Sequence, residues 1–394
     1  MFLNLNSEKI KLFIATGLQG FYRVITLFII ELFYGLSEVG KIGIHLSVSQ
    51  IISFFTVIGF CTLILSRVSG ISDDLKKFQV FNELLINIII NLIIILIIFN
   101  TLNFFINISY HLEISAWLFS WTFYITSRHY FLADKNYNTI IKTDLLLIFL
   151  SIFAIWSNYF NNISIVLSVI MFLISVINFL IIGNFKYFKL KKIRIEPKGF
   201  EFGLANFVSS SLLLSLMPLS SLFLSLTYTG ILALFINCAN IIMLVPRSIS
   251  IYLIPLFSKV KSQTKEVNNL LSNLMGKILI ITILILGVFI FFSKMILIFY
   301  SIDSQKLFYI FIFISLYLST NNFSILYSTV IIIYEQSKAS LIITIITSLV
   351  YLFFIIFSYL NGTNNSFLII SVGLFVAGLI RLILLKKFIY KNYA

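Results

Sequence analysis

Two arginines lie deep inside long apolar stretches of this sequence, where a charged side chain needs a specific reason to be. Arg23 lies about 12 residues into the first stretch, and Arg247 lies about 12 residues before Lys259, which ends another. At about 1.5 Å per residue, each would be near the middle of a membrane-spanning helix. A charge there needs a partner, a wet cavity or a bound group. A planar guanidinium donates paired hydrogen bonds to carboxylates and phosphates, so both residues are candidates for binding an anion.

Three further polar residues in apolar stretches are candidates for the same cavity. We expect Arg128 near its cytoplasmic mouth, and Gln50 and Asn240 in the middle of their stretches. Amides can bind a ligand, and they can equally tie helices together inside a membrane. An arginine can instead reach the membrane surface or bind backbone carbonyls, and we expect Arg381 to be a surface anchor of this kind.

The acidic residues fall elsewhere in the pattern. We expect ten of the fourteen at helix ends or in loops next to the predicted spans, either on the cytoplasmic side (Glu83, Asp134, Asp144, Glu201, Glu266, Glu335) or near the outer face (Glu31, Glu38, Glu113, Asp303). The sequence therefore predicts that the deep charge is cationic and has no equally deep acid to neutralise it.

The composition indicates that the helices carrying these arginines lie in a membrane. The chain of 394 residues is 60% hydrophobic and only 11% charged, whereas soluble domains carry about 25% charged residues. The net charge of +14 is scattered between apolar stretches and does not form a nucleic-acid surface. Two cysteines in apolar stretches, Cys61 and Cys238, cannot by themselves build a disulfide framework or a metal site. The chain is predicted to be a polytopic membrane protein with no nucleic-acid partner.

About 20 apolar residues cross a bilayer as a helix. The sequence predicts twelve such helices, of which the fifth is the shortest, at 12–33, 42–65, 80–100, 114–132, 143–158, 163–184, 202–226, 230–256, 277–300, 307–332, 339–360 and 367–386. The stretches are continuously apolar, which favours helices over the alternating strands of a barrel. The predicted fold class is therefore all-α.

Basic residues predict the orientation and the division of the chain. Most of the 28 lysines and arginines fall on one side when the N-terminus is cytoplasmic, which places both termini in the cytoplasm. A basic linker at 186–199 separates an N-terminal six-helix bundle at 1–185 from a C-terminal one at 200–394. Short matching signatures in the two halves indicate parallel repeats, an arrangement common in transporters with a substrate site between the halves.

Prolines and glycines mark positions where helices could bend. Proline removes a backbone hydrogen bond and can kink a helix, as a hinge or as a static bend. We expect hinges at Pro218, Pro246, Pro255, Gly17 and Gly20. By contrast, we interpret the pair Gly199 and Gly203 at a helix start as incidental.

Two stretches resemble a known family. The first, ELFYGLSEVGKIGIHLSVSQIISFFTVIGFCTLILSRVSG (31–70), contains the Tyr34-Gly35 element at the end of a first helix and a basic residue closing the second. The second, IIMLVPRSISIYLIPLFSKV (241–260), ends in a Pro-x-x-Ser element at Pro255 and Ser258. Both are similar to polysaccharide repeat-unit (O-antigen or capsule) flippases of the multidrug/oligosaccharidyl-lipid/polysaccharide (MOP) exporter superfamily, although this chain is short and has no acid at mid-depth in its first helix.

The resemblance implies two bundles that alternate between inward-open and outward-open states in the bacterial inner membrane. The cargo would be an oligosaccharide linked to undecaprenyl pyrophosphate, moved from the cytoplasmic to the periplasmic leaflet. Arg23, Arg247 and Arg128 would then bind the pyrophosphate, and Gln50 and Asn240 the sugar hydroxyls. Membrane lipids, a polysaccharide polymerase and chain-length machinery are the partners it implies.

The motifs present in the sequence indicate how transport could be driven and which other functions remain possible. It has no Walker-type phosphate loop, so we expect no cofactor, and a membrane potential or an ion gradient as the driving force. His45 is the nearest titratable candidate, but we expect it near the outer end of its helix in a packing role. A multidrug exporter of the same superfamily and a membrane-embedded O-antigen polymerase or glycosyltransferase remain alternatives. The short predicted outer loops favour a protein that is not an enzyme.

Overall fold

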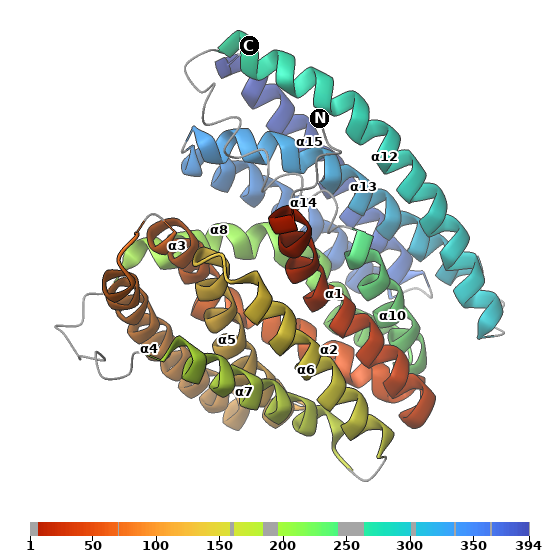
Figure 1. The fold of residues 1–394 in the computed structure, drawn as a ribbon. Coiled ribbons are helices and arrows are strands. Elements are labelled where there is room, and N and C mark those ends of the chain that lie inside the picture. The colour runs from red at the N-terminus through yellow and green to blue at the C-terminus, as the bar shows by residue number, and fades with distance from the viewer. Residues whose placement is uncertain are drawn as a thin grey trace. The chain divides into compact units, whose positions relative to one another are not determined.

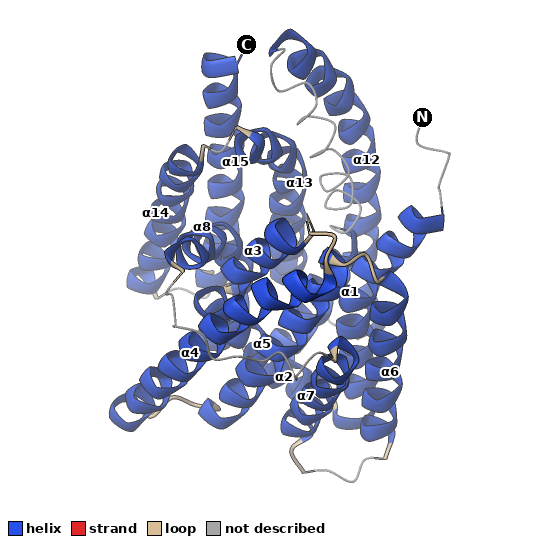
Figure 2. Cartoon of the chain, turned by 60° about the vertical axis from the view of Figure 1, so that its left-hand side comes forward, coloured by secondary structure: helices blue, strands red, loops and turns tan. Residues whose placement is uncertain are grey.

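A computed structural model describes residues 7–69, 71–157, 161–183, 196–242, 264–300, 305–334, 336–362 and 365–393. Within these ranges the regular structure is entirely helical, as Figures 1 and 2 show. The predicted all-α fold class is confirmed. Helices dominate because a backbone in lipid must satisfy its own hydrogen bonds, which a helix does within one segment.

The chain divides into two compact units, residues 1–218 and 219–394. The helices of the first unit are α1 (Ser7–Tyr34), α2 (Leu36–Ser53), the π-helix η1 (Phe54–Ile58), α3 (Gly59–Val68), α4 (Asp74–Ile106), α5 (His111–Ala133), α6 (Tyr137–Trp156), α7 (Ile163–Ile182) and α8 (Pro197–Leu214). Helix α9 (Leu216–Phe223) crosses the boundary. The helices of the second unit are α10 (Leu226–Ile242), α12 (Thr264–Phe299), α13 (Gln305–Ile333), α14 (Ser337–Asn361) and α15 (Ser366–Tyr393).

Nine segments within the described residues are long and apolar enough to cross a membrane. They are Ile10–Tyr34, Leu36–Val68, Asp74–Ile106, Tyr137–Trp156, Ile163–Ile182, Ile278–Phe299, Gln305–Ile331, Lys338–Asn361 and Ser366–Asn392. Two shorter apolar segments, Ser211–Phe223 (the end of α8 together with α9) and Leu226–Ala239, overlap the seventh and eighth predicted spans. The fourth predicted span coincides with α5, whose 23 residues fall outside those nine. The chain is a multi-pass membrane protein; its orientation stays a prediction.

Short polar residues set the ends of the helices in the first unit. Asp73 precedes α4, and its side chain accepts a hydrogen bond from the backbone nitrogen of Leu75 at 3.0 Å. Asn136 and Asn162 cap α6 and α7 in the same way. Such caps satisfy backbone N–H groups that lack a partner inside the helix. Gly35 adopts a φ of 81° between α1 and α2, a conformation that glycine tolerates best.

The second predicted span contains a π-helical turn that the sequence did not predict. A π-helical turn, η1, separates α2 from α3, and such turns are rare. Directly after it, Gly59 lies so close to α8 that a Cβ atom there would overlap the backbone of Gly199 and Gly203. The interpretation of that glycine pair as incidental is therefore wrong, because the two glycines let the backbones of α3 and α8 meet.

The structure also interrupts the seventh predicted span close to Pro218. Helix α8 ends at Leu214, and α9 begins at Leu216 after a single turn residue. Pro218 has no N–H to donate to the carbonyl of Leu214, which accounts for a break at this place. Helix α1 runs without interruption through the expected hinge positions Gly17 and Gly20. Movement at any of these positions stays a prediction, and Pro246 and Pro255 lie outside the described residues.

Candidate functional site

Arg23 lies near the middle of α1 and meets two side chains from other helices. Its Nη1 donates to Oε1 of Gln50 in α2 at 3.1 Å. Its guanidinium carbon lies 4.7 Å from the centroid of the Trp121 ring in α5, a distance typical of a cation–π contact. The structure thus brings together two predicted site residues, Arg23 and Gln50. Whether they bind a substrate stays a prediction.

Trp121 is the member of this group that sequence reasoning missed. The residue is only 5% exposed, and its indole nitrogen has no hydrogen-bond partner among the described residues. A buried indole N–H normally finds an acceptor, so an unused donor next to a guanidinium suits a ligand rich in oxygen. An aromatic residue in an apolar stretch carries no signal of such a role in the sequence.

Hydrogen bonds from α2 and η1 to α5 hold Gln50 and Trp121 in place. The hydroxyl of Ser49 in α2 donates to the backbone oxygen of Ile114 at 2.8 Å. Further along, the hydroxyl of Thr56 in η1 lies 3.3 Å from that of Thr122 in α5. Because these contacts flank the site along both segments, the arginine faces a fixed amide and a fixed ring. We name the three residues Arg23, Gln50 and Trp121 the N-terminal site.

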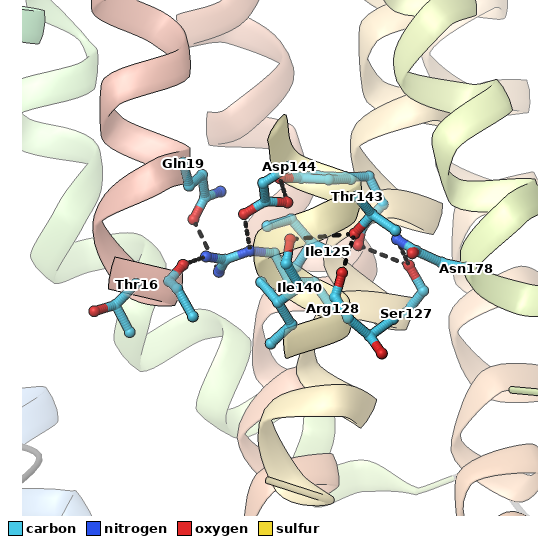
Figure 3. A network of polar contacts seen from close by, with 12 residues as sticks. Thr16, Gln19, Ile125, Ser127, Arg128, Ile140, Thr143, Asp144 and Asn178 are labelled. Carbon is cyan, nitrogen blue, oxygen red and sulfur yellow. Dashed lines mark hydrogen bonds and ion pairs between the residues drawn. The ribbon is translucent and has the colours of Figure 1, made fainter. Parts of the chain in front are cut away.

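Arg128 lies in a separate network in the same unit (Figure 3). Its Nε donates to Oδ2 of Asp144 in α6 at 3.3 Å, and the two side chains are almost fully buried. The hydroxyl of Tyr124 donates to Oδ1 of Asp144 at 2.7 Å. The remaining guanidinium nitrogens of Arg128 reach α1, at Oε1 of Gln19 and the backbone oxygen of Ala15.

This network differs from the expectation that no acid lies deep in the protein. Asp144 was expected at a cytoplasmic helix end or in a loop, but α6 begins at Tyr137, which places Asp144 two turns into the helix. A buried charge is tolerated only when it is paired and hydrogen-bonded, as both members are here. Arg128 thus has structural partners of its own, and its contact with a substrate headgroup stays a prediction.

The other polar residues singled out from the sequence have different surroundings. Nδ1 of His45 lies 2.8 Å from the hydroxyl of Ser164, which also accepts a hydrogen bond from the indole of Trp117. Asn240 belongs to α10. Arg247 lies outside the described residues, so the predicted cavity that it would share with Arg23 stays a prediction.

Arg381, which the sequence predicts as a surface anchor, contacts a polar side chain of another helix in its own unit. It lies in the interior of α15, is partly buried, and its Nη1 donates to Oδ1 of Asn321 in α13 at 3.4 Å. Its Nε is enclosed and has no hydrogen-bond partner within the described part of the chain. The second unit therefore also holds a cation between its helices.

The comparisons with known proteins point to one fold. No family model matches the chain, and no curated protein matches it. The MATE multidrug transporter DinF-BH has a similar structure, with a TM-score of 0.72 and 16% identity over 98% of this chain and 94% of that one. A MATE transporter from Vibrio cholerae, VcmN, gives 0.56 and 12% identity over 98% and 99%.

A third solved structure is a MOP superfamily transporter from Pyrococcus furiosus, for which a binding pocket of reverse polarity is said to suggest a different function. Its TM-score is 0.55, with 14% identity over 97% of this chain and 94% of that one. Identities this low show the fold alone. The chain is a multi-pass membrane protein with the fold of MOP superfamily transporters.

Proposed function

We propose that this chain is a transporter that moves anionic lipid-linked oligosaccharides from the cytoplasmic to the periplasmic leaflet of the bacterial inner membrane. The cargo class is an oligosaccharide repeat unit on undecaprenyl pyrophosphate, and transport proceeds by alternating access. The fold of MOP superfamily transporters supports transport as such. The sign of the buried charge supports the choice of cargo.

One observation carries the choice of an anionic cargo. Asp144 is the only buried acidic residue among those described, and Arg128 and Tyr124 already occupy both of its oxygens. It is therefore not available to attract a cation. The other deep charges in the described helices, Arg23 and Arg381, are positive. Because a cargo should carry the opposite charge to its site, an anionic headgroup fits best.

The N-terminal site offers suitable chemistry for such a headgroup. The guanidinium of Arg23 can donate paired hydrogen bonds to phosphate oxygens. The unused indole N–H of Trp121 and the amide of Gln50 add neutral donors for phosphate or sugar oxygens. Moving a negative charge outward across an inside-negative membrane is favourable by about 2.3 kcal/mol per charge per 100 mV, so the potential alone can drive the step.

A multidrug exporter is the second candidate. The observation in its favour is that a structural neighbour, DinF-BH, is a multidrug transporter. A cationic drug, however, would need an unpaired carboxylate inside the helices, and Asp144, the only buried carboxylate among the described residues, is paired with Arg128. The enzyme alternatives have no observation in their favour.

A translocation assay in proteoliposomes tests the proposal. Fluorescent undecaprenyl-pyrophosphate oligosaccharide is placed in one leaflet, and its appearance in the other is followed with a membrane-impermeant quencher. We expect the wild-type protein to translocate the oligosaccharide. Arg23→Gln should slow translocation about tenfold or more, because a charge-assisted hydrogen bond is lost. The control Lys142→Gln, which removes an exposed cation in the same unit, should leave the rate unchanged. Transport of a cationic dye in place of the oligosaccharide would refute the proposal.

A further inference from the structure

The contact between Arg381 and Asn321 has a counterpart in the other half of the chain. In the first unit, Nδ2 of Asn178 in α7 donates to the hydroxyl of Ser127 in α5 at 3.2 Å. Ser127 lies 16 residues after the first residue of α5, and Asn321 lies 16 residues after the first residue of α13. Asn178 and Arg381 each lie 15 residues after the first residue of α7 and α15. The two contacts therefore occupy equivalent positions.

The equivalence exposes a difference in charge between the halves. The first half carries a neutral amide where the second carries Arg381. It also carries Asp144, seven residues into α6. The residue seven positions into α14 is Thr344, which is buried at 3% exposure. The carboxylate that neutralises a buried arginine in the first half thus has no counterpart in the second.

Three helices that pack together around Arg381 contain no acid that could take the place of the Asp144 carboxylate. None of α13, α14 and α15, which pack together (Figure 1), has an aspartate or glutamate anywhere in its sequence. Asn321 offers one amide oxygen, and Nε of Arg381 is enclosed without a partner in the described structure. A cation inside an apolar bundle needs a counter-charge, and here these three helices supply none.

Close packing of the helices keeps the guanidinium near its amide. Gly378 lies one turn before Arg381 in α15, and a Cβ atom there would lie 2.6 Å from the hydroxyl of Thr320 and 2.8 Å from the ring of Tyr317. The missing side chain therefore lets α15 approach α13. Asn321 directly follows Thr320, so this approach sets the distance between the arginine and the amide.

We infer that Arg381 and Asn321 form an anion-binding subsite within the second unit, which takes a phosphate group. The guanidinium supplies the charge and paired donors, and the amide of Asn321 can turn its NH₂ group to the same ligand. The phosphate can belong to the lipid-linked headgroup or be free in solution. Only the first source rests on the proposed function.

Binding measurements on the full-length protein in nanodiscs test this subsite. All variants carry Arg23→Gln, so that the N-terminal site contributes little, and binding of inorganic pyrophosphate and of a short prenyl pyrophosphate is measured by microscale thermophoresis. Asn321→Asp places a carboxylate directly on Arg381 with almost no change in shape. We expect it to weaken pyrophosphate binding about tenfold or more while the ligand-free protein melts at the same or a higher temperature.

Two further variants separate binding from folding. Lys386→Gln removes an exposed cation five residues along the same helix and should leave the Kd within about twofold, whereas Arg381→Lys should retain part of the affinity. If Arg381 only ties α15 to α13, Asn321→Asp will strengthen that contact and leave pyrophosphate binding unchanged, which overturns the inference.

The two ligands then identify the source of the phosphate. Tighter binding of prenyl pyrophosphate than of inorganic pyrophosphate indicates a lipid headgroup, and equal binding indicates free phosphate. If pyrophosphate binds through Arg381 but no oligosaccharide is translocated, the subsite stands and the proposed function fails. If oligosaccharide is translocated but Asn321→Asp binds pyrophosphate as tightly as its parent does, the proposed function stands and the subsite fails.

Discussion

The buried pair of Arg128 and Asp144 allows a prediction whose size follows from the structure. Both side chains are at most 5% exposed, and the two atoms of the ion pair are 3.3 Å apart. Removing one member leaves the other buried without a counter-charge, which typically costs about 3–5 kcal/mol. Asp144→Asn and Arg128→Met should each lower the free energy of unfolding by about this amount.

The double variant should be less destabilised than either single one. When both charges are removed, no buried charge remains, and the amide that Asp144→Asn introduces still accepts the hydroxyl of Tyr124. The cost then falls to the acceptor that Arg128 leaves at Gln19, about 1–3 kcal/mol if it is unsatisfied. The coupling energy between the two positions should therefore exceed about 2 kcal/mol. Lys41→Gln, which breaks the more exposed pair of Lys41 and Glu38, is the matched control and should cost at most about 1 kcal/mol.

Unfolding of the purified protein by SDS in mixed micelles measures these free energies. The slope of free energy against SDS fraction should be the same in all variants, which shows that the same transition is compared. Single variants within about 1 kcal/mol of wild type, or a double variant whose cost equals the sum of the two, would show that the pair does not carry a buried charge. Asp144 would then be an accessible carboxylate, and an anionic cargo would lose its main support.

Three further predictions concern the first unit. Gly59→Ala should destabilise the protein by about 1–3 kcal/mol or more, because its Cβ would overlap the backbone of α8, while Gly287→Ala, with nothing within 4 Å, should be neutral or stabilising in the same SDS titration. The hydrogen bond from Arg67 lowers the pKa of Glu196 below its ordinary value, so this carboxylate stabilises the fold above about pH 4.3. That stabilisation disappears as the pH falls through the lowered pKa of the folded protein. Melting curves of Glu196→Gln should therefore lack this loss of stability at acidic pH. Trp121→Phe keeps the ring but removes the indole N–H, so translocation should slow several-fold while thermal stability stays near wild type; an unchanged rate would exclude a direct contact with cargo.

The helices could be predicted from the sequence because a membrane span leaves a long continuous signal. The apolar stretch at 12–33 became α1, and the break near Pro218 followed from a missing N–H. Helix ends carry a weaker signal. A shift of the predicted start from residue 143 to Tyr137 was enough to move Asp144 from a helix end to the interior of the bundle.

Contacts between distant helices could not be predicted in this way. Arg23 and Gln50 were both candidates, but their direct hydrogen bond depends on how α1 packs against α2. Trp121 and Gly59 carried no signal at all, because an aromatic or a glycine in an apolar stretch is ordinary until its neighbours are known. The sequence predicts Arg381 as a surface anchor and gives no sign of its contact with Asn321.

The sign of the cargo's charge can be measured most directly by equilibrium binding. Purified wild-type protein is titrated with a prenyl pyrophosphate, with the corresponding prenyl alcohol and with a lipophilic cation of similar size. An anion-binding site predicts that the pyrophosphate binds at least about tenfold more tightly than the alcohol, that Arg23→Gln reduces this preference, and that the cation does not compete. Equal binding of pyrophosphate and alcohol, or displacement of either by the cation, would contradict an anionic cargo.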